Sequence, residues 1–187
     1  MSKSITLILI LICIIFFLLE SLPYFIETLY FIPNQAFEMP WTFVTSIFLH
    51  ADFVHLFFNM FGLLMFGSYL ERKISRRDYI IIFFIAGIVG NFGYMFTSFD
   101  KDIPAVGASG AIYGIMGCLA VLEPYATVYV GYLPMPMIVA ALFWAFIEFL
   151  GIFIPSNIAH GSHLFGLIVG IAFGIYRRKN LYRKFNI

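Results

Sequence analysis

The chain has 187 residues, of which 62% are hydrophobic, 20% aromatic and only 11% charged. Because a soluble domain carries about 25% charged residues, this composition excludes an ordinary soluble protein and predicts a single membrane domain over residues 1–187. The formal net charge is +1, and no basic stripe lies outside the ends of the apolar segments, so nothing favours nucleic-acid binding.

Six apolar stretches, separated by charged residues or by proline and glycine, predict membrane-spanning helices. They cover residues 5–19, 53–70, 79–97, 107–122, 135–154 and 160–176. The first begins after Lys3 as a signal peptide would, but no small-residue cleavage site follows it, so we expect a retained anchor. The predicted fold class is therefore an all-α polytopic membrane protein with six transmembrane helices.

The basic residues gather on one side of these predicted helices. One precedes the first helix, four lie between the second and third, and five follow the sixth, which accounts for ten of the 11 in the chain. Only Lys101 lies on the other side. The positive-inside rule therefore predicts that both termini are cytoplasmic.

Residues 20–52 form the longest connection and are rich in Phe, Tyr, Trp and Pro. Within it, Phe25, Ile26, Leu29 and Tyr30 recur at helical spacing. The segment is either a plain exterior loop or a loop half embedded in the membrane interface, and its aromatic content favours the second alternative. We therefore predict a half-embedded first exterior loop.

Polar side chains in three of the predicted helices reach the same depth. Counted from the cytoplasmic ends at about 1.5 Å per residue, Ser109 and His163 lie roughly 21 and 20 Å up, and Asn59 and His55 roughly 17 and 23 Å. In a hydrocarbon core about 30 Å thick, all four lie near one level, about 10 Å below the exterior surface. Polar groups at such a depth are costly and usually face the bundle interior or a water-filled cavity.

Glycines predict that two of these helices touch. One stripe consists of Gly107, Gly110, Gly114 and Gly117, and a second, spaced by four, of Gly166, Gly170 and Gly174. Small residues let helix backbones approach closely in lipid. Packing the two stripes together would bring His163 beside Ser109.

Ser109 by itself is typical of a packing residue in a glycine-rich helix, and His163 by itself of a satisfied interior histidine. Together they predict a nucleophile and its base, because a serine hydroxyl needs a nearby imidazole to become reactive. His55 and Asn59, four residues apart on one helix face, and the Ser109 backbone N–H at a helix N-terminus are candidate oxyanion donors. Tyr113, one turn below Ser109, is expected to stack on the His163 ring and orient it.

The remaining polar residues receive lesser roles. Glu148 is the only acid well inside a predicted helix, and no carboxylate has obvious geometry for a triad. We interpret Glu148 mainly as a structural or gate residue, with tuning of the site as the alternative. His50 is expected to fix the loop through a hydrogen bond or to help line the oxyanion region, and His160 is expected to be solvated.

Cys13 and Cys118 lie in apolar runs without redox or zinc spacing, so we expect packing thiols, no metal and no cofactor.

Three motifs resemble those of the rhomboid proteases. Residues 50–59 carry H-x4-H-x3-N, residues 107–110 carry G-x-S-G, and residues 163–170 carry H-x-x-G-x-x-x-G. The motifs lie in this order on the second, fourth and sixth predicted helices, and the resemblance extends over essentially the whole chain. One departure is Trp41-Thr42, where family members often carry Trp-Arg; it affects a loop anchor and leaves the chemistry untouched.

The resemblance implies a rhomboid-like six-helix bundle and an intramembrane serine endopeptidase with a Ser109–His163 dyad. It implies that His55, Asn59 and the Ser109 N–H form the oxyanion hole, supported by Tyr113, His50, Gly107 and Gly110. Substrates would be transmembrane proteins cut near the outer end of a helix, and the fifth helix with its following loop would act as a lateral gate and cap. The resemblance also implies the plasma (inner) membrane of a prokaryote, with a site open toward the exterior.

Two other function classes are compatible with polar residues inside a membrane. A catalytically inactive rhomboid-like protein would bind or escort membrane clients, but such proteins typically lack the serine or the histidine, and this chain has both. A channel or transporter would be expected to show a polar path through the full thickness or internal inverted repeats, and the sequence shows neither. The sequence leaves the oligomeric state open.

Overall fold

A computed structural model describes residues 4–20, 26 and 28–185, with side chains as far as residue 179. Lys3 and Phe25, on which two of the predictions draw, lie outside the described residues. The long helices are α1 (Ile5–Leu19), α3 (Phe53–Gly62), α5 (Arg76–Thr97), α6 (Ser109–Leu122), α7 (Met137–Gly151) and α8 (His160–Phe185). α3 continues through a π-helical turn, η3 (Leu63–Gly67), into the short α4 (Ser68–Glu71).

Each of the six predicted segments overlaps one of these helices, with differences at the ends: α5 begins three residues before the predicted 79. α7 is shorter than the predicted 135–154, and α8 runs past the predicted end at residue 176 into the basic tail. Among the described residues, Phe53–Glu71 and Arg76–Thr97 are long and apolar enough to cross a bilayer. α1, α6 and α7 are apolar but shorter than that.

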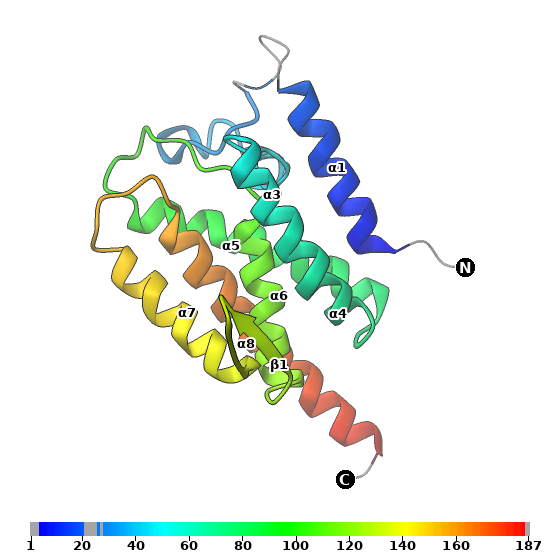
Figure 1. Cartoon of the computed structure of the whole chain (residues 1–187). Helices are drawn as coiled ribbons and strands as arrows, with labels where there is room; N and C mark the ends of the chain where they lie inside the picture. Colours follow the sequence, from blue (N-terminus) through cyan, green and yellow to red (C-terminus); the bar gives the residue numbers. More distant parts are fainter. Residues whose placement is uncertain (1–3, 21–25, 27, 186–187) are drawn as a thin grey trace.

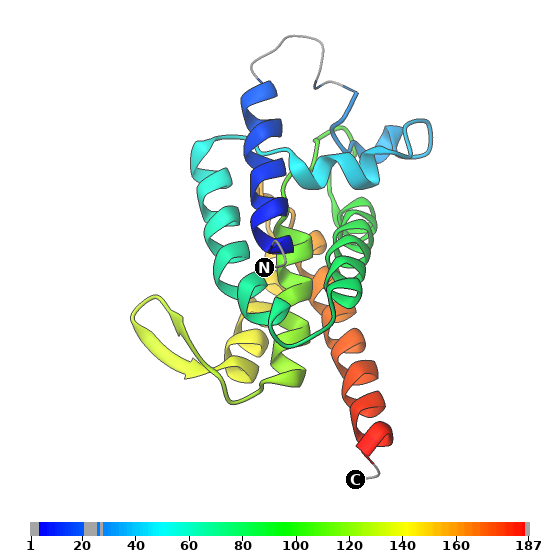
Figure 2. The same cartoon turned by 90° about the vertical axis from the view of Figure 1, so that its right-hand side faces the viewer.

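The centre of the bundle is α6, which packs most extensively on α8 and next on α5. Figures 1 and 2 show α6 enclosed by the other helices, with α1 on the outside of the bundle. Ten of its 14 residues are buried, and Cys118 lies in this core as a free thiol, as does Cys13.

The predicted glycine seam between α6 and α8 is confirmed. A β-carbon at Gly166 would overlap the carbonyl oxygen of Gly110, and one at Gly170 would overlap that of Gly114. Only residues without a side chain allow the two backbones to approach this closely. The seam therefore fixes how α8 sits along α6.

Loop 1, residues 20–52, is tied to the connection that precedes α6. It contains the short helices η1 (Pro33–Gln35), α2 (Thr42–Thr45) and η2 (Ser46–Phe48), whereas Ile26, Leu29 and Tyr30 lie in bends and turns in place of the helical spacing expected there. Phe31 forms an isolated β-bridge with Ala105.

Asn91 on α5 anchors the same loop from inside the bundle. Its side-chain amide donates to the Phe43 carbonyl at 3.0 Å and to Ser46 Oγ at 2.9 Å. The Ser46 carbonyl in turn accepts from the Gly107 N–H at 2.9 Å. Loop 1 thereby holds the segment that leads into Ser109.

Trp41 and Thr42 stabilise loop 1 by donating hydrogen bonds to backbone carbonyls within it. The Trp41 indole N–H donates to the Thr28 carbonyl at 2.7 Å. Thr42 is only 1% exposed and its hydroxyl donates to the Met39 carbonyl at 2.6 Å. A buried threonine that closes a local turn thus stands where the family resemblance suggested an arginine.

Figures 1 and 2 show the β-hairpin at the end of the bundle opposite loop 1, and two ion pairs join helix ends in the same part of the chain. Lys73 pairs with Glu123 at 2.6 Å and Arg177 with Asp78 at 2.9 Å. The hairpin consists of β1 (Thr127–Val130) and β2 (Leu133–Pro136), with Val130 opposite Leu133. Its two-residue turn contains Gly131 at φ 62°, a conformation that suits glycine.

Candidate active site

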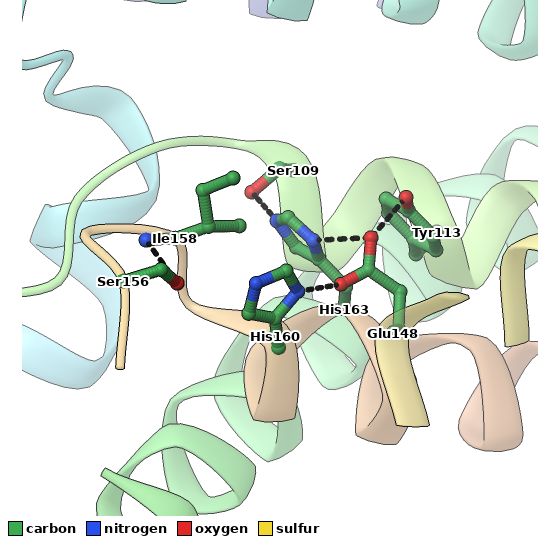
Figure 3. Close-up of polar contacts among 7 residues, drawn as sticks. All are labelled: Ser109, Tyr113, Glu148, Ser156, Ile158, His160 and His163. Carbon is green, nitrogen blue, oxygen red and sulfur yellow. Dashed lines mark hydrogen bonds and ion pairs between the residues drawn. The ribbon is translucent and has the colours of Figure 1, made fainter. Parts of the chain in front are cut away.

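Ser109 and His163 meet where α6 and α8 begin. Ser109 is the first residue of α6, and His163 lies in the first turn of α8. Ser109 Oγ is 2.7 Å from His163 Nε2 (Figure 3). The distance is that of a hydrogen bond between a hydroxyl and an imidazole.

Small residues around Ser109 make this contact possible. A β-carbon at Gly110 would lie 2.7 Å from Ser162 Oγ, and the neighbouring Gly166 rests on the Gly110 backbone. Because neither position carries a side chain, the first turns of the two helices touch. His163 is thereby held beside the serine by backbone packing, which is more rigid than a contact between long side chains.

The predicted stacking of Tyr113 on His163 is confirmed. The ring centroids are 4.5 Å apart and the ring planes differ by 4°. Tyr113 lies one turn after Ser109 on α6. It therefore covers one face of the imidazole and restricts its rotation.

Glu148 and His160 are closer to the site than expected. Glu148 is 5% exposed, and its Oε1 lies 3.0 Å from His163 Nδ1 and accepts from the Tyr113 hydroxyl at 2.5 Å. Its Oε2 lies 2.6 Å from His160 Nδ1. The prediction that His160 is solvated is wrong, because its side chain is 14% exposed and is held by this carboxylate.

The end of α7 explains how these groups come together. Glu148 lies one turn before Gly151, where α7 ends, and His160 begins α8. A β-carbon at Gly151 would collide with the His160 ring, so the glycine lets α7 and α8 meet closely. The carboxylate is thereby level with the first turns of α6 and α8.

His55 faces the space beside Ser109. Asp52 caps α3 because its side chain accepts a hydrogen bond from the His55 backbone N–H at 2.7 Å. The Ala51 backbone N–H donates to His55 Nδ1 at 3.4 Å. Because Nδ1 accepts, the ring hydrogen belongs on Nε2. The point where a β-carbon at Gly107 would sit is 2.8 Å from His55 Nε2 and 3.8 Å from Ser109 Oγ.

Gly107 lets the His55 ring lie close to the chain that leads into Ser109. Its φ is 118°, which side-chain-bearing residues rarely adopt. A β-carbon here would lie 2.8 Å from the His55 ring, so the imidazole already takes the space that a side chain would need. The absence of a side chain at Gly107 thus allows His55 to approach the Ser109 region.

Asn59 and His50 surround His55. The Asn59 amide nitrogen donates to the His55 carbonyl at 2.9 Å, and its Oδ1 is buried without a partner among the described residues. His50 is 1% exposed, and its ring lies 5.3 Å from the His55 ring. Its backbone N–H donates to Glu20 in loop 1 at 2.9 Å, and neither ring nitrogen has a hydrogen-bond partner among the described residues. Burial lowers the pKa of His50 to about 3, with the neighbouring His55 adding to the effect.

The N-terminus of α6 supplies further donors. No side chain caps this helix end, so the first backbone N–H groups carry the positive end of the helix dipole without a side-chain partner. Among the residues that the structure describes, no group of three His, Cys, Asp or Glu side chains is arranged to hold a metal ion. The site contains a hydroxyl that can act as a nucleophile, an imidazole that can act as its base, and N–H groups that can bind an oxyanion. Acyl transfer requires these three kinds of group.

Comparison with known proteins identifies the family. A model described as the Rhomboid domain matches residues 38–180. The chain belongs to the rhomboid family. It is therefore a helical membrane protein that crosses the bilayer more than once.

Curated relatives in the rhomboid family carry protease names. "Putative rhomboid protease YdcA" of Bacillus subtilis is 37% identical over 130 residues, which cover 70% of this chain and 63% of that protein. "Rhomboid protease GlpG" of Salmonella paratyphi A is 30% identical over 145 residues, which cover 76% of this chain and 50% of that protein. The chain thus matches between half and two thirds of the length of these rhomboid relatives.

Glu148 is the site residue whose position the sequence did not reveal. An acid inside a membrane helix is by itself a signal of function. Its depth was uncertain because the predicted helix 135–154 extends three residues past the observed end of α7. Because α7 ends at Gly151 and not at Ile154, Glu148 lies within one turn of the helix end. This places Glu148 at the level of Ser109.

Proposed function

We propose that this chain is an intramembrane serine endopeptidase that hydrolyses a peptide bond in or near the outer end of a transmembrane segment. The single observation that supports this most is the 2.7 Å contact between Ser109 Oγ and His163 Nε2 at the start of α6. Membership of the rhomboid family and the protease names of its relatives support the same activity. Ser109 is the nucleophile and His163 the general base.

The acylation step uses the groups around Ser109. Ser109 Oγ attacks the substrate carbonyl carbon while its proton passes to His163 Nε2. The developing oxyanion accepts from His55 Nε2–H and from the Ser109 backbone N–H. The second hydrogen of the Asn59 amide is the remaining donor. The C–N bond then breaks, and the protonated His163 gives its proton to the leaving amine.

Deacylation reverses the roles with water. Water attacks the acyl ester carbon and gives a proton to His163 Nε2. The bond to Ser109 Oγ breaks, and that proton returns to the serine as the new carboxyl product departs. Both halves use the same oxyanion donors, and neither needs a metal or cofactor.

Water and product access are supported by a cavity of about 330 Å³ next to the site. It is lined on one side by the end of α5, including Thr97, and the α5–α6 connection, including Asp100, and on the other by the α7–α8 connection, including Ser156, together with His160 and Gly161. Because α6 begins only at Ser109, the chain above the serine is loop.

The membrane arrangement that fits this activity has six spans within a single domain, residues 1–187, and both termini in the cytoplasm. It is supported by the basic residues at the end of the bundle that carries the Lys73–Glu123 and Arg177–Asp78 pairs. Loop 1 then lies on the exterior side, half embedded, above the active site. The plasma (inner) membrane of a prokaryote is the proposed location, and transmembrane proteins are the proposed substrates.

The alternative, a rhomboid-like protein that binds clients without cutting them, predicts different behaviour. To separate the two, the protein is reconstituted with a single-span reporter peptide and compared with Ser109→Ala and His163→Ala. We expect cleavage by the wild type and none by either variant, while all three insert equally. Cleavage by Ser109→Ala at the wild-type rate would refute the assignment, and an inactive but folded wild type would favour the client-binding role.

A further inference from the structure

We propose that Glu148 is a positioning residue that acts through His163, so that the site works as a Ser–His–Glu arrangement with its acid supplied by α7. The inference rests on the proposed function, because it assigns a role to a neighbour of the base. It goes beyond the dyad that the sequence motifs imply.

The burial of Glu148 requires a reason. A carboxylate that is 5% exposed inside a helical bundle is costly unless it is paired. Its described polar partners are Tyr113 from α6 and His160 and His163 from α8, and none carries a permanent positive charge. A purely structural contact at this place would be served at lower cost by an amide or a hydroxyl. A negative charge is useful where a positive charge develops.

The position of that charge matches the base. Glu148 Oε1 lies 3.0 Å from Nδ1 of His163, while Nε2 on the other side of the ring contacts Ser109 (Figure 3). A carboxylate at Nδ1 favours the tautomer with hydrogen on Nδ1 and a lone pair on Nε2. That is the form that can take the serine proton.

The resting contact is close but poorly aligned. His163 Nδ1 is buried and makes no regular hydrogen bond to any described residue. The same Glu148 oxygen accepts from the Tyr113 hydroxyl, and the Tyr113 ring is stacked parallel to His163. One oxygen cannot lie in both ring planes, so it serves Tyr113 well and His163 less well. Apo enzymes often show such loose catalytic contacts, which tighten as charge develops.

His160 keeps the carboxylate in place. It lies 2.6 Å from Glu148 Oε2, the oxygen that faces away from His163, and its ring rests on Gly151. The two oxygens therefore have separate tasks: Oε2 fixes the side chain between α7 and α8, and Oε1 faces the base.

The proton path remains balanced in this arrangement. The serine proton moves to His163 Nε2, and the ring then carries hydrogen on both nitrogens. The Nδ1–H donates to Glu148 Oε1, and the carboxylate stays ionised throughout. The proton leaves on the product amine. Glu148 thus stabilises the imidazolium that exists only during the reaction, which affects kcat more than KM.

The test compares Glu148→Gln with His160→Gln in nanodiscs, using a fluorogenic transmembrane peptide. Glutamine has nearly the same shape as glutamate and still accepts from Tyr113, but it has no charge for His163. In serine proteases with a Ser–His–Asp triad, the equivalent change lowers kcat about 10⁴-fold. We expect Glu148→Gln to lower kcat between about 10²- and 10⁴-fold with KM little changed, and His160→Gln to keep kcat within about tenfold of the wild type.

Two further variants make each outcome decisive. Glu148→Asp keeps the charge one methylene farther away, and we expect a kcat between those of the wild type and Glu148→Gln. If Glu148→Gln does not fold, a wild-type kcat for Glu148→Asp overturns the inference and a reduced one supports it. Equal losses in Glu148→Gln and His160→Gln would also overturn it, because they indicate a helix tie alone. Full activity of Glu148→Gln beside an inactive Ser109→Ala refutes only this inference, whereas an active Ser109→Ala refutes the proposed function itself.

Discussion

Gly107 gives a sharp prediction, because a single methyl group there would collide with the His55 ring. In Gly107→Ala, the new β-carbon would lie 2.8 Å from both Cε1 and Nε2 of the His55 ring. The backbone would also hold an alanine at φ 118°. The substitution therefore disturbs the backbone and the proposed oxyanion donor together.

A matched control separates these two effects. Gly131 also has a positive φ, 62°, but nothing lies within 4 Å of its would-be β-carbon. Gly131→Ala costs only backbone strain, about 1–2 kcal/mol. Gly107→Ala adds the displacement of the imidazole to a strain of roughly 1–3 kcal/mol. Loss of one oxyanion donor lowers kcat by about 10²–10³-fold, and we expect a fall of that size in Gly107→Ala.

The assay measures melting temperature and kcat for both variants in the same detergent. We expect both to lose stability, Gly107→Ala more than Gly131→Ala, and only Gly107→Ala to lose activity. A Gly107→Ala protein with wild-type kcat would show that the position of the His55 ring does not affect the reaction. An equal fall of kcat in Gly131→Ala would show that stability, and not the oxyanion site, sets the rate.

Three further predictions concern packing, loop anchoring and pH. Gly170→Ala places a methyl on the Gly114 carbonyl and should cost about 1–3 kcal/mol of stability. The control, Gly62→Ala, has its nearest neighbour 3.5 Å away and should be neutral or gain up to about 1 kcal/mol. Equal melting temperatures for the two variants would contradict close backbone packing between α6 and α8. Asn91→Leu removes both hydrogen bonds to loop 1 and should cost about 1–3 kcal/mol of stability for each buried oxygen left unpaired. We expect a protease to cut loop 1 faster in this variant than in the wild type. An unchanged rate of proteolysis would show that other contacts hold the loop. Burial lowers the pKa of His50 to about 3, below the unfolded value near 6.5. Between these two pH values the unfolded chain binds one proton more than the folded chain does. The free energy of unfolding therefore falls as pH drops below about 6.5, by up to about 1.4 kcal/mol at pH 5.5. His50→Gln should lose less stability than the wild type over that range in thermal melts, and parallel curves would refute the reasoning.

Helices and the Ser109–His163 contact were predictable because local patterns determine them. Apolar runs between charges mark the helices, and glycines spaced by four identify the faces that touch. The stacked Tyr113 followed from its place one turn after Ser109. Each of these depends on spacing within one helix, which the sequence displays directly.

Other features depended on where chain segments end, and the sequence leaves that open. The position of Glu148 was not predictable, because three residues of error at the end of α7 move a side chain by about 4.5 Å. His160 was expected to be solvated because it lies at the exterior end of its helix, and the sequence does not show that Glu148 reaches it. The hairpin at residues 127–136 was missed because Pro134 and Pro136 are unusual in a strand, although Gly131 between two β-branched or apolar stretches was a usable signal.

The central claim is that Ser109 is a nucleophile activated by His163. It is tested most directly by treating the folded protein with a fluorophosphonate and mapping the adduct by mass spectrometry. We predict one adduct, on Ser109, that disappears in His163→Ala while the melting temperature is retained. A wild-type protein that cleaves its reporter without labelling Ser109, or that labels Ser109 equally well without His163, would contradict the claim.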